Sequence, residues 1–398
     1  MKLVYTHATF TIAATHARDA NDGLFVRRIP ISVVPPMIEC TRHDTSAQRY
    51  RLFDPDHWTA DLIEAPLARR AWVVQERILS PRVLFFAKTQ IYFQCCSFTA
   101  CESFPGGRPL WHVHTGFEGP KHTGISPEEA WHDAAMKYNK ASLTRVSDRV
   151  VAIAGVAERM QELLKDSYVI GLWKRFLPLG LAWDSYGGQR VTPYLAPTWS
   201  WLSLTGGIKQ YEPSQQVGDP FIEIRQIHVQ PQNPKHITGN IMPGAWLIAY
   251  GTLKPASLEE DARYARSRYP RYVWRCDGVK NNPNYHGSFG LDVVAVTGVP
   301  ASEVFLLPVV TISEFDGSKA IRGLMLVLAD ELEDTYERVG SFAVPEDKSE
   351  RLFLRRMEPL AGISRQGLRG RLEDSREHRD SDDDVEWERI PAQDIKIM

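Results

Sequence analysis

The 398-residue sequence lacks the short motifs that identify many enzymes. It contains no Walker A loop, no GxGxxG, no HExxH, no CxxC and no GxSxG. A P-loop, a dinucleotide-binding fingerprint, a zinc-protease helix and a nucleophile elbow are therefore excluded as starting points. Any chemistry has to be argued from individual side chains and their spacing.

The sequence also lacks an excess of charge of either sign and has no long apolar run. Its 47 Lys and Arg against 49 Asp and Glu give a formal charge of −2, which argues against a nucleic-acid binder that works through a bulk basic field. The longest apolar runs, such as 176–183, are far shorter than a membrane span. Residues 1–10 contain no apolar core of a signal peptide. We therefore predict a cytoplasmic protein with no membrane span and no nucleic-acid partner.

Cysteine is scarce and irregularly spaced, so a disulfide framework is not expected. Cys95, Cys96 and Cys101, followed by His112 and His114, could in principle hold zinc. Adjacent residues at the end of a strand point to opposite faces, so Cys95 and Cys96 cannot easily serve one metal. We therefore predict buried thiols and no metal site.

The most distinctive segment that is present is a helix expected at 69–82. Apolar residues fall on one side of it at helical spacing, namely Leu67, Ala71, Val74 and Ile78. Trp72 and Glu76 stand four residues apart and share a second side. This pattern fits the wall of a cleft, where a partly desolvated carboxylate suits acid/base or oxocarbenium-stabilising work. The alternative is a Trp packed under a loop, with Glu76 solvated or paired to an arginine.

A strand and a turn precede this helix. Residues 8–15 are small and β-prone, which predicts a strand buried on both faces of a parallel sheet. Asp19, Asn21, Asp22 and Gly23 then predict a turn. Because ligands bind beyond the carboxyl ends of strands in open α/β sheets, Asp19 and Asp22 are secondary ligand-binding candidates. Simple turn chemistry is the alternative for both.

The rest of the chain predicts short strands at 83–86 and 90–95, then helices at 128–140, 147–165 and 170–183, with Ser147 as the N-cap of the second. From about residue 190 short strands and turns dominate, at 221–229, 245–253, 270–276, 290–297, 303–312, 321–329, 335–343 and 351–357. Residues 364–398 are rich in charge and predict disorder. The predicted divisions are an α/β segment at 1–105, a helical segment at 106–210, a β-rich region at 211–360 and a disordered charged tail at 361–398.

Several blocks resemble the fungal heterokaryon incompatibility (HET) domain family. The blocks of its central part are Arg70-Ala71-Trp72, Gln75-Glu76 and Leu79-Ser80-Pro81-Arg82-Val83-Leu84. Further blocks in the same order are Thr11-Ile12-Ala13-Ala14, Asp22-Gly23-Leu24-Phe25, Asp148-Arg149, Ala196-Pro197-Thr198-Trp199-Ser200-Trp201 and Arg338-Val339-Gly340. The resemblance runs from residue 1 to about residue 345.

The sequence departs from the family's pattern at its start. HET domains begin with a Tyr- and Trp-containing strand block and an acidic, Cys-containing strand, both of which would precede Met1. The resemblance therefore implies an N-terminally truncated domain whose parallel sheet is incomplete. Such a sheet would have an open edge that has to be covered.

The resemblance implies a fold similar to TIR domains and a role in self/non-self recognition and regulated cell death. Some TIR domains cleave NAD with a glutamate four residues after an aromatic on a helix. By this spacing Glu76 would stabilise the ribosyl cation and Trp72 would stack on NAD or a related nucleotide, with no further cofactor. The alternatives are a non-enzymatic adaptor or decoy that pairs with other HET-type proteins or with itself, and an auxiliary protein of a secondary-metabolite gene cluster.

Overall fold

The computed structural model describes residues 1–41, 47–52, 54, 56–107, 126–260, 272–276, 279–280, 289–292, 304–314, 317–345 and 391–398. The chain divides into two compact units, Met1–Lys165 and Asp166–Met398. Each unit contains its own sheet and its own buried apolar cluster. The boundaries expected at residues 105, 210 and 360 stay predictions. None of the helices in the described part of the chain is long and apolar enough to cross a membrane.

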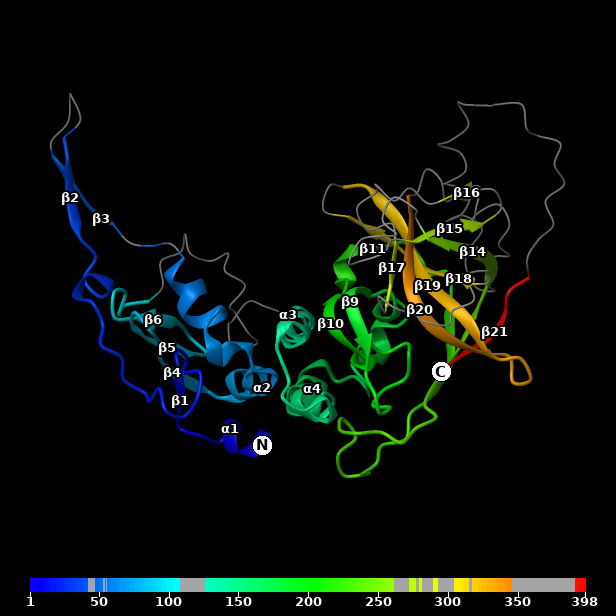
Figure 1. Cartoon of the computed structure of the whole chain (residues 1–398), viewed down its shortest axis with the longest axis horizontal. Helices are drawn as coiled ribbons and strands as arrows, with labels where there is room; N and C mark the ends of the chain where they lie inside the picture. Colours follow the sequence, from blue (N-terminus) through cyan, green and yellow to red (C-terminus); the bar gives the residue numbers. More distant parts are fainter. Residues whose placement is uncertain are drawn as a thin grey trace. The chain divides into compact units, whose positions relative to one another are not determined.

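The first unit contains a 4-stranded mixed sheet in the order β1-β4-β5-β6 (Figure 1). Its strands are β1 (Thr11–Ala14), β4 (Arg82–Phe86), β5 (Ile91–Cys95) and β6 (Thr99–Cys101). β1 runs parallel to β4, whereas β4, β5 and β6 pair antiparallel. The predicted α/β character with parallel strands is confirmed for this region, and so are the two short strands around Lys88 and Thr89.

β1 lies at the edge of the described sheet, which corrects the prediction of a strand buried on both faces. Within the described residues it pairs only with β4. Ile12 keeps 52% of its surface exposed, whereas Ala13 is buried in the cluster that contains Trp58 and Val83. The weak alternation of this segment is therefore the pattern of a strand with one covered face.

The helical elements of the first unit are α1 (Lys2–Thr6), η1 (Pro30–Ser32), η2 (Thr59–Ile63), η3 (Pro66–Arg69), α2 (Ala71–Leu79), α3 (Pro127–Lys140), η5 (Val146–Asp148) and α4 (Val151–Leu164). A hairpin of β2 (Met37–Cys40) and β3 (Gln48–Arg51) lies in the stretch between β1 and η2. α3 begins with a reciprocal capping box between Ser126 and Glu129. α4 begins without a side-chain cap, and the predicted N-cap Ser147 is wrong because it lies inside η5.

α2 buries Ala71, Val74, Gln75 and Leu79, so the predicted stripe is only partly right. The helix starts at Ala71 because η3 ends at Arg69 and Arg70 is extended. Gln75 is polar yet buried because its Oε1 accepts a hydrogen bond of 2.8 Å from the backbone N–H of Gly155 in α4. This contact fixes α2 on α4.

A Gly155→Ala substitution is expected to destabilise the first unit by about 1–3 kcal/mol, although Ala normally stabilises a helix interior relative to Gly. A Cβ at this position would stand 2.6 Å from Gln75 Oε1 and 3.3 Å from a methyl of Leu79. Urea denaturation measures the free energy of unfolding. The double variant Gly155→Ala with Gln75→Ala should recover part of the lost free energy of unfolding. A Gly155→Ala variant that is more stable than the wild type would contradict the close packing of α2 on α4.

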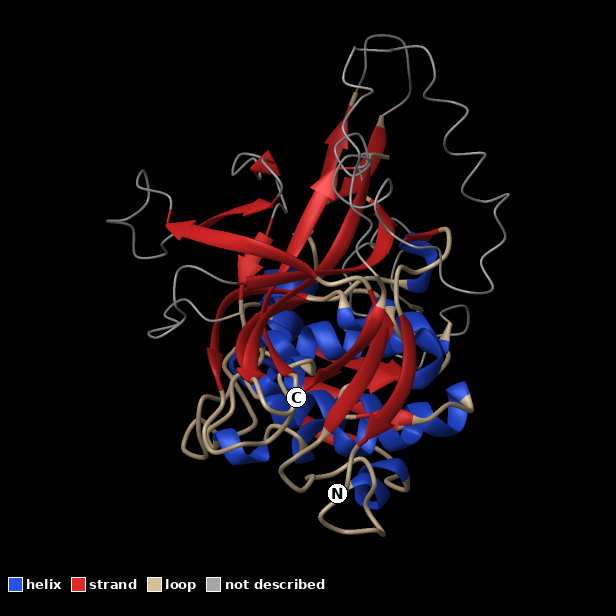
Figure 2. Cartoon of the chain, turned by 90° about the vertical axis from the view of Figure 1, so that its right-hand side faces the viewer, coloured by secondary structure: helices blue, strands red, loops and turns tan. Residues whose placement is uncertain are grey.

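The second unit consists mainly of strands (Figure 2). Its largest sheet is 11-stranded, with the main order β12-β13-β21-β20-β19-β18-β14-β15-β16, while β11 pairs with β18 and β17 pairs with β20. The strands of the unit are β7 (Tyr168–Val169), β8 (Leu172–Trp173), β9 (Asp184–Arg190), β10 (Leu204–Lys209), β11 (Gln216–Val217), β12 (Glu223–His228), β13 (Trp246–Gly251), β14 (Lys254–Glu260), β15 (Tyr272–Cys276), β16 (Val279–Lys280), β17 (Phe289–Leu291), β18 (Val304–Ser313), β19 (Lys319–Asp330), β20 (Thr335–Pro345) and β21 (Gln393–Ile397). Short 3₁₀ helices are η6 (Lys174–Phe176), η7 (Leu179–Leu181), η8 (Trp201–Ser203) and η9 (Pro213–Gln215). The β-rich C-terminal half is confirmed, and the strand predicted at 351–357 lies outside the described residues.

The helix predicted at 170–183 is wrong. β7 and β8 form a hairpin there, closed by Ile170 and Gly171 with φ of 37° and 92°. Glycine suits this turn because a positive φ costs it little. The missing Cβ of Gly171 also leaves room for the Trp201 indole, whose Nε1 donates to the Gly171 carbonyl at 2.8 Å.

The tail predicted to be disordered ends in a strand. β21 pairs with β13 and, over two residues, with β20, and it buries Ile395 and Ile397 completely. Ile395, Lys396 and Ile397 alternate over only three residues and follow a long charged segment. This alternation is too short to predict a strand from the sequence. Residues 361–390 of the predicted tail lie outside the described residues.

Candidate functional site

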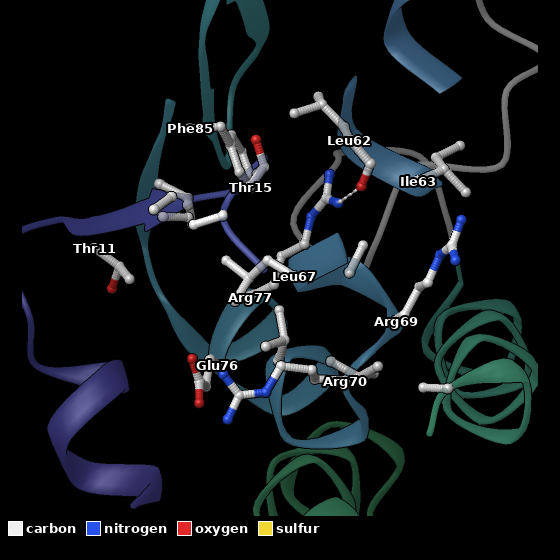
Figure 3. Close-up of a pocket in the computed structure, with 18 of the residues that line it drawn as sticks. Thr11, Thr15, Leu62, Ile63, Leu67, Arg69, Arg70, Glu76, Arg77 and Phe85 are labelled. Carbon is white, nitrogen blue, oxygen red and sulfur yellow. Dashed lines mark hydrogen bonds between the residues drawn. The ribbon is translucent and has the colours of Figure 1, made fainter. Parts of the chain in front are cut away.

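A cavity of about 590 Å³ lies in the first unit, on the covered side of β1 (Figure 3). Residues from β1, the following turn, η2, η3, α2, β4, β5 and the end of α3 line it. Its size is in the range of sites that hold small molecules. The cavity therefore forms where the helical elements of this unit meet the sheet.

Apolar side chains line part of the cavity, namely Leu62, Ile63, Leu67, Val83 and Phe85. Leu62, Val83 and Phe85 belong to the buried cluster of the unit. We call these five residues the apolar floor. It would accept the flat or apolar part of a ligand, since burial of such surface is favourable.

Arg77 places a buried positive charge beside this floor. Its Nε donates to Gln94 Oε1 at 3.1 Å, its Nη1 donates to the Leu62 carbonyl at 3.4 Å, and its guanidinium lies 4.8 Å from the centre of the Phe85 ring. Burial lowers the pKa of Arg77, an effect that the charge of Asp133 opposes. No local sequence pattern singles out Arg77, because only the long-range packing of α2 on β4 and β5 buries its guanidinium.

Glu76, the predicted catalytic residue, lines the cavity and is half-buried. Its aromatic neighbour is Tyr5 of α1: burial, together with the charge of Glu76 and a hydrogen bond to it, raises the pKa of Tyr5 to about 12. The carboxylate thus stands at one end of the cavity with a phenol beside it. The catalytic role of Glu76 stays a prediction.

The structure does not bring the predicted ligand-binding residues to the same cavity. Trp72 is not among the lining residues, and its Nε1 donates to Asp148 Oδ2 at 3.1 Å. Asp22 Oδ2 accepts a hydrogen bond of 2.8 Å from the backbone N–H of Arg18 in the expected turn. The other acid of this turn, Asp19, does line the cavity. The ligand-binding roles of Trp72 and Asp22 also stay predictions.

Most of the charged residues that line the cavity are basic, and no sequence pattern predicted this. Lining residues with a positive charge are Arg18, Arg69, Arg70, Arg77, Lys137 and Lys140, against the two acids Asp19 and Glu76. The adjacent pair Arg69-Arg70 was visible in the sequence. The sequence could not show that this pair lines a basic cavity, because Lys137 and Lys140 belong to a helix far along the chain.

The cysteines do not form a metal cluster in the described part of the chain. Cys101 is buried as predicted, whereas Cys95 is half-buried and Cys96 is exposed, so the prediction of buried thiols fails for Cys96. Cys96 follows the end of β5 and is not covered by a neighbouring strand. His112 and His114 lie outside the described residues.

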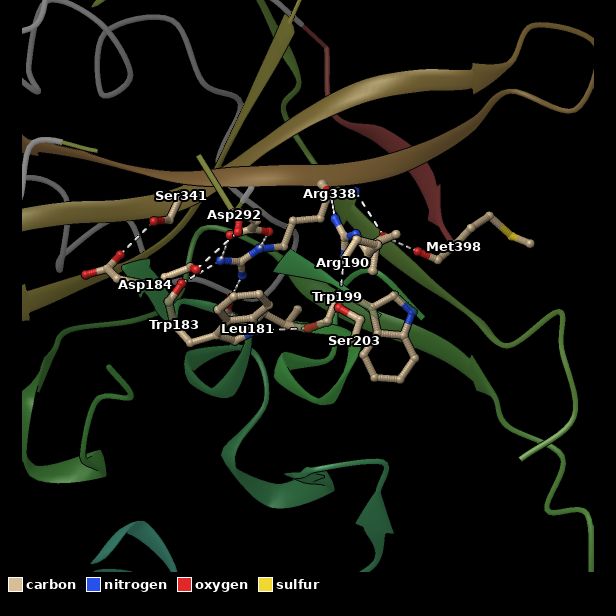
Figure 4. A network of polar contacts seen from close by, with 12 residues as sticks. Leu181, Trp183, Asp184, Arg190, Trp199, Ser203, Asp292, Arg338, Ser341 and Met398 are labelled. Carbon is tan, nitrogen blue, oxygen red and sulfur yellow. Dashed lines mark hydrogen bonds and ion pairs between the residues drawn. The ribbon is translucent and has the colours of Figure 1, made fainter. Parts of the chain in front are cut away.

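A second polar centre lies in the other unit and is closed to solvent (Figure 4). Arg338 Nε and Nη2 donate to the two oxygens of Asp292 at 2.9 and 3.2 Å, and neither side chain is exposed. Arg338 also donates to the carbonyls of Leu181 and Trp183 at 2.6 Å each, and its guanidinium lies 3.3 Å from the Trp183 ring. This cluster links β20 to η7, to Trp183 and to the residue that follows β17.

Comparison with known proteins identifies one region. Residues 1–76 match the family model described as heterokaryon incompatibility protein (HET). No curated protein and no solved structure matches the chain significantly. The resemblance predicted for the residues beyond 76 is not covered by this match.

Proposed function

We propose, on the premise that residues 1–76 are a HET domain, that the chain acts in fungal vegetative incompatibility. In this role it takes part in self/non-self recognition in the cytoplasm and triggers regulated cell death. One observation carries the proposal: the matched residues supply much of the cavity. They include β1, the turn after it, η2, η3 and α2 as far as Glu76.

Cleavage of a nucleotide at its glycosidic bond is the chemistry that we propose for this cavity. A half-buried carboxylate at the end of a small-molecule cavity supports it, because such a group can stabilise the positive charge that develops on a ribosyl ring. The parallel pairing of β1 with β4 is compatible with a TIR-like fold. Trp72 would then hold α2 through Asp148, and the apolar floor would receive the base or the nicotinamide ring.

A non-enzymatic adaptor is the second candidate, and the position of β1 at the edge of the described sheet favours it. Ile12 is half exposed on this strand, and Phe10 just before it is 54% exposed. A strand edge of this kind can pair with a strand of another chain. The partner would be another HET-type protein or a second copy of this chain.

Glu76→Gln distinguishes the two candidates. Induced expression of the wild-type chain in a fungal host is expected to arrest growth, and the variant is expected to lose the arrest at equal protein level, because the amide cannot stabilise a developing cation. Glu64→Gln is the matched control, since Glu64 is exposed and does not line the cavity. Growth is scored as colony radius and viable count.

The growth assay and the enzyme assay separate the role in cell death from the catalytic role of Glu76. Growth without arrest by the wild-type chain would overturn the role in cell death. Arrest that persists in Glu76→Gln would remove the catalytic proposal and favour the adaptor. Incubation of the purified chain with NAD provides the direct test, in which turnover has to be present in the wild type and lost in Glu76→Gln.

A further inference from the structure

The backbone joins two basic segments that are far apart in the sequence. Ala71 N–H donates to the Ser142 carbonyl at 2.9 Å, and Ser142 N–H donates to the Arg69 carbonyl at 2.6 Å. Arg70 and Ser142 thereby form a parallel bridge. This bridge places Arg69 and Arg70, before α2, next to the end of α3, where Lys140 is the last residue.

The positive charges that line the cavity outnumber its two carboxylates, Asp19 and Glu76. Arg18, Arg69, Arg70 and Lys140 line the cavity and are exposed. Within the described residues none of these four forms an ion pair, and the Nε of Arg69 donates to a backbone carbonyl, that of Glu64. We call these four residues the basic rim. Four positive charges around one cavity make its electrostatic potential positive, and this favours the binding of an anion.

Two further features favour an anion at the same place. α2 begins at Ala71 without a side-chain cap, so the partial positive charge of its N-terminus adds to that of the rim. Arginine also binds phosphate oxygens through two parallel hydrogen bonds, which lysine and a helix end can supplement. The rim therefore suits a group with several anionic oxygens better than a single carboxylate.

We propose that the basic rim binds the phosphates of a nucleoside diphosphate whose ring system lies on the apolar floor. The proposal rests on the proposed function in that the same cavity contains Glu76, but binding itself needs no catalysis. A charged rim beside an apolar floor in one cavity of about 590 Å³ matches a ligand with a polyanionic end and a flat end.

The test is direct binding to the purified full chain by isothermal titration. The probes are ADP, adenosine and inorganic pyrophosphate, which separate the two ends of the ligand. ADP is expected to bind at least about tenfold more tightly than either fragment, and its affinity should fall as ionic strength rises. ADP that binds no better than adenosine would overturn the proposal.

Variants locate the phosphates. Arg70→Gln and Lys140→Gln are each expected to weaken ADP binding by about tenfold and to leave adenosine binding unchanged, since each loses one charge-assisted contact. Lys88→Gln is the matched control, because this exposed lysine lies in the β4–β5 turn away from the cavity and changes the net charge equally. Unchanged ADP affinity in both rim variants would overturn the proposal.

Failure of this inference and failure of the proposed function are distinguishable. Glu76→Gln should still bind ADP, because it leaves the rim intact. A wild-type chain that binds ADP through the rim but does not arrest growth contradicts only the proposed function. A chain that arrests growth but does not bind ADP contradicts only the present proposal.

Discussion

Asp292→Ala is expected to lower the free energy of unfolding of the second unit by about 3–5 kcal/mol. The substitution leaves the guanidinium of Arg338 fully buried without its carboxylate. The hydrogen bonds from Arg338 to Leu181 and Trp183 hold that charge in place, so the side chain cannot simply turn towards water. Urea denaturation followed by tryptophan fluorescence measures the loss, since Trp183 contacts the guanidinium.

The control is an ion pair on the surface of the same unit. Arg225 and Asp394 meet at 2.8 Å but keep about half of their side-chain surface exposed, at 42% and 54%. Asp394→Ala should therefore cost no more than about 1 kcal/mol. Equal small losses for Asp292→Ala and Asp394→Ala would contradict the role of the buried pair.

A double variant separates the pair from its surroundings. Arg338→Met with Asp292→Ala removes both charges, so it should cost clearly less than the sum of the two single substitutions. It should not reach the stability of the wild type, because the carbonyls of Leu181 and Trp183 lose their donor. Additive single losses would show that the two side chains act independently.

The sequence predicted elements better than it predicted their partners. Helical spacing was enough to place α3, and alternating apolar residues placed most long strands of the second unit. Arg338 lies in one of those predicted strands, yet its burial depends on Asp292, which is 46 residues away. Local periodicity cannot predict a pairing between residues so far apart in the sequence.

The candidate site shows the same limit. Spacing alone singled out the helix with Trp72 and Glu76, and Glu76 does line a cavity. Trp72 does not, because Asp148, 76 residues further along the chain, accepts the hydrogen bond of its indole. The basic rim depends on backbone bonds between Ser142 and the start of α2, so no pattern within either segment could predict it.

Removal of residues 391–398 is expected to destabilise the second unit enough to make it aggregate. β21 separates β13 from β20, and its loss would uncover one edge of β13 together with the apolar side chains that Ile395 and Ile397 cover. An uncovered strand edge is a template for pairing with other chains. Soluble yield and size-exclusion chromatography measure the result, and a monomeric truncated chain with unchanged unfolding would contradict the expectation.

Point substitutions in β21 test how much its buried side chains contribute to the free energy of unfolding. Ile395→Ala and Ile397→Ala should each cost about 2–5 kcal/mol, because both side chains are fully buried. Lys396→Ala, on the opposite face, removes a partly exposed ion pair with Glu333 and should cost at most about 1 kcal/mol. An excess of a synthetic peptide of residues 391–398 should restore solubility to the truncated chain, because the slot between β13 and β20 binds a strand through backbone hydrogen bonds whether or not it is covalently attached.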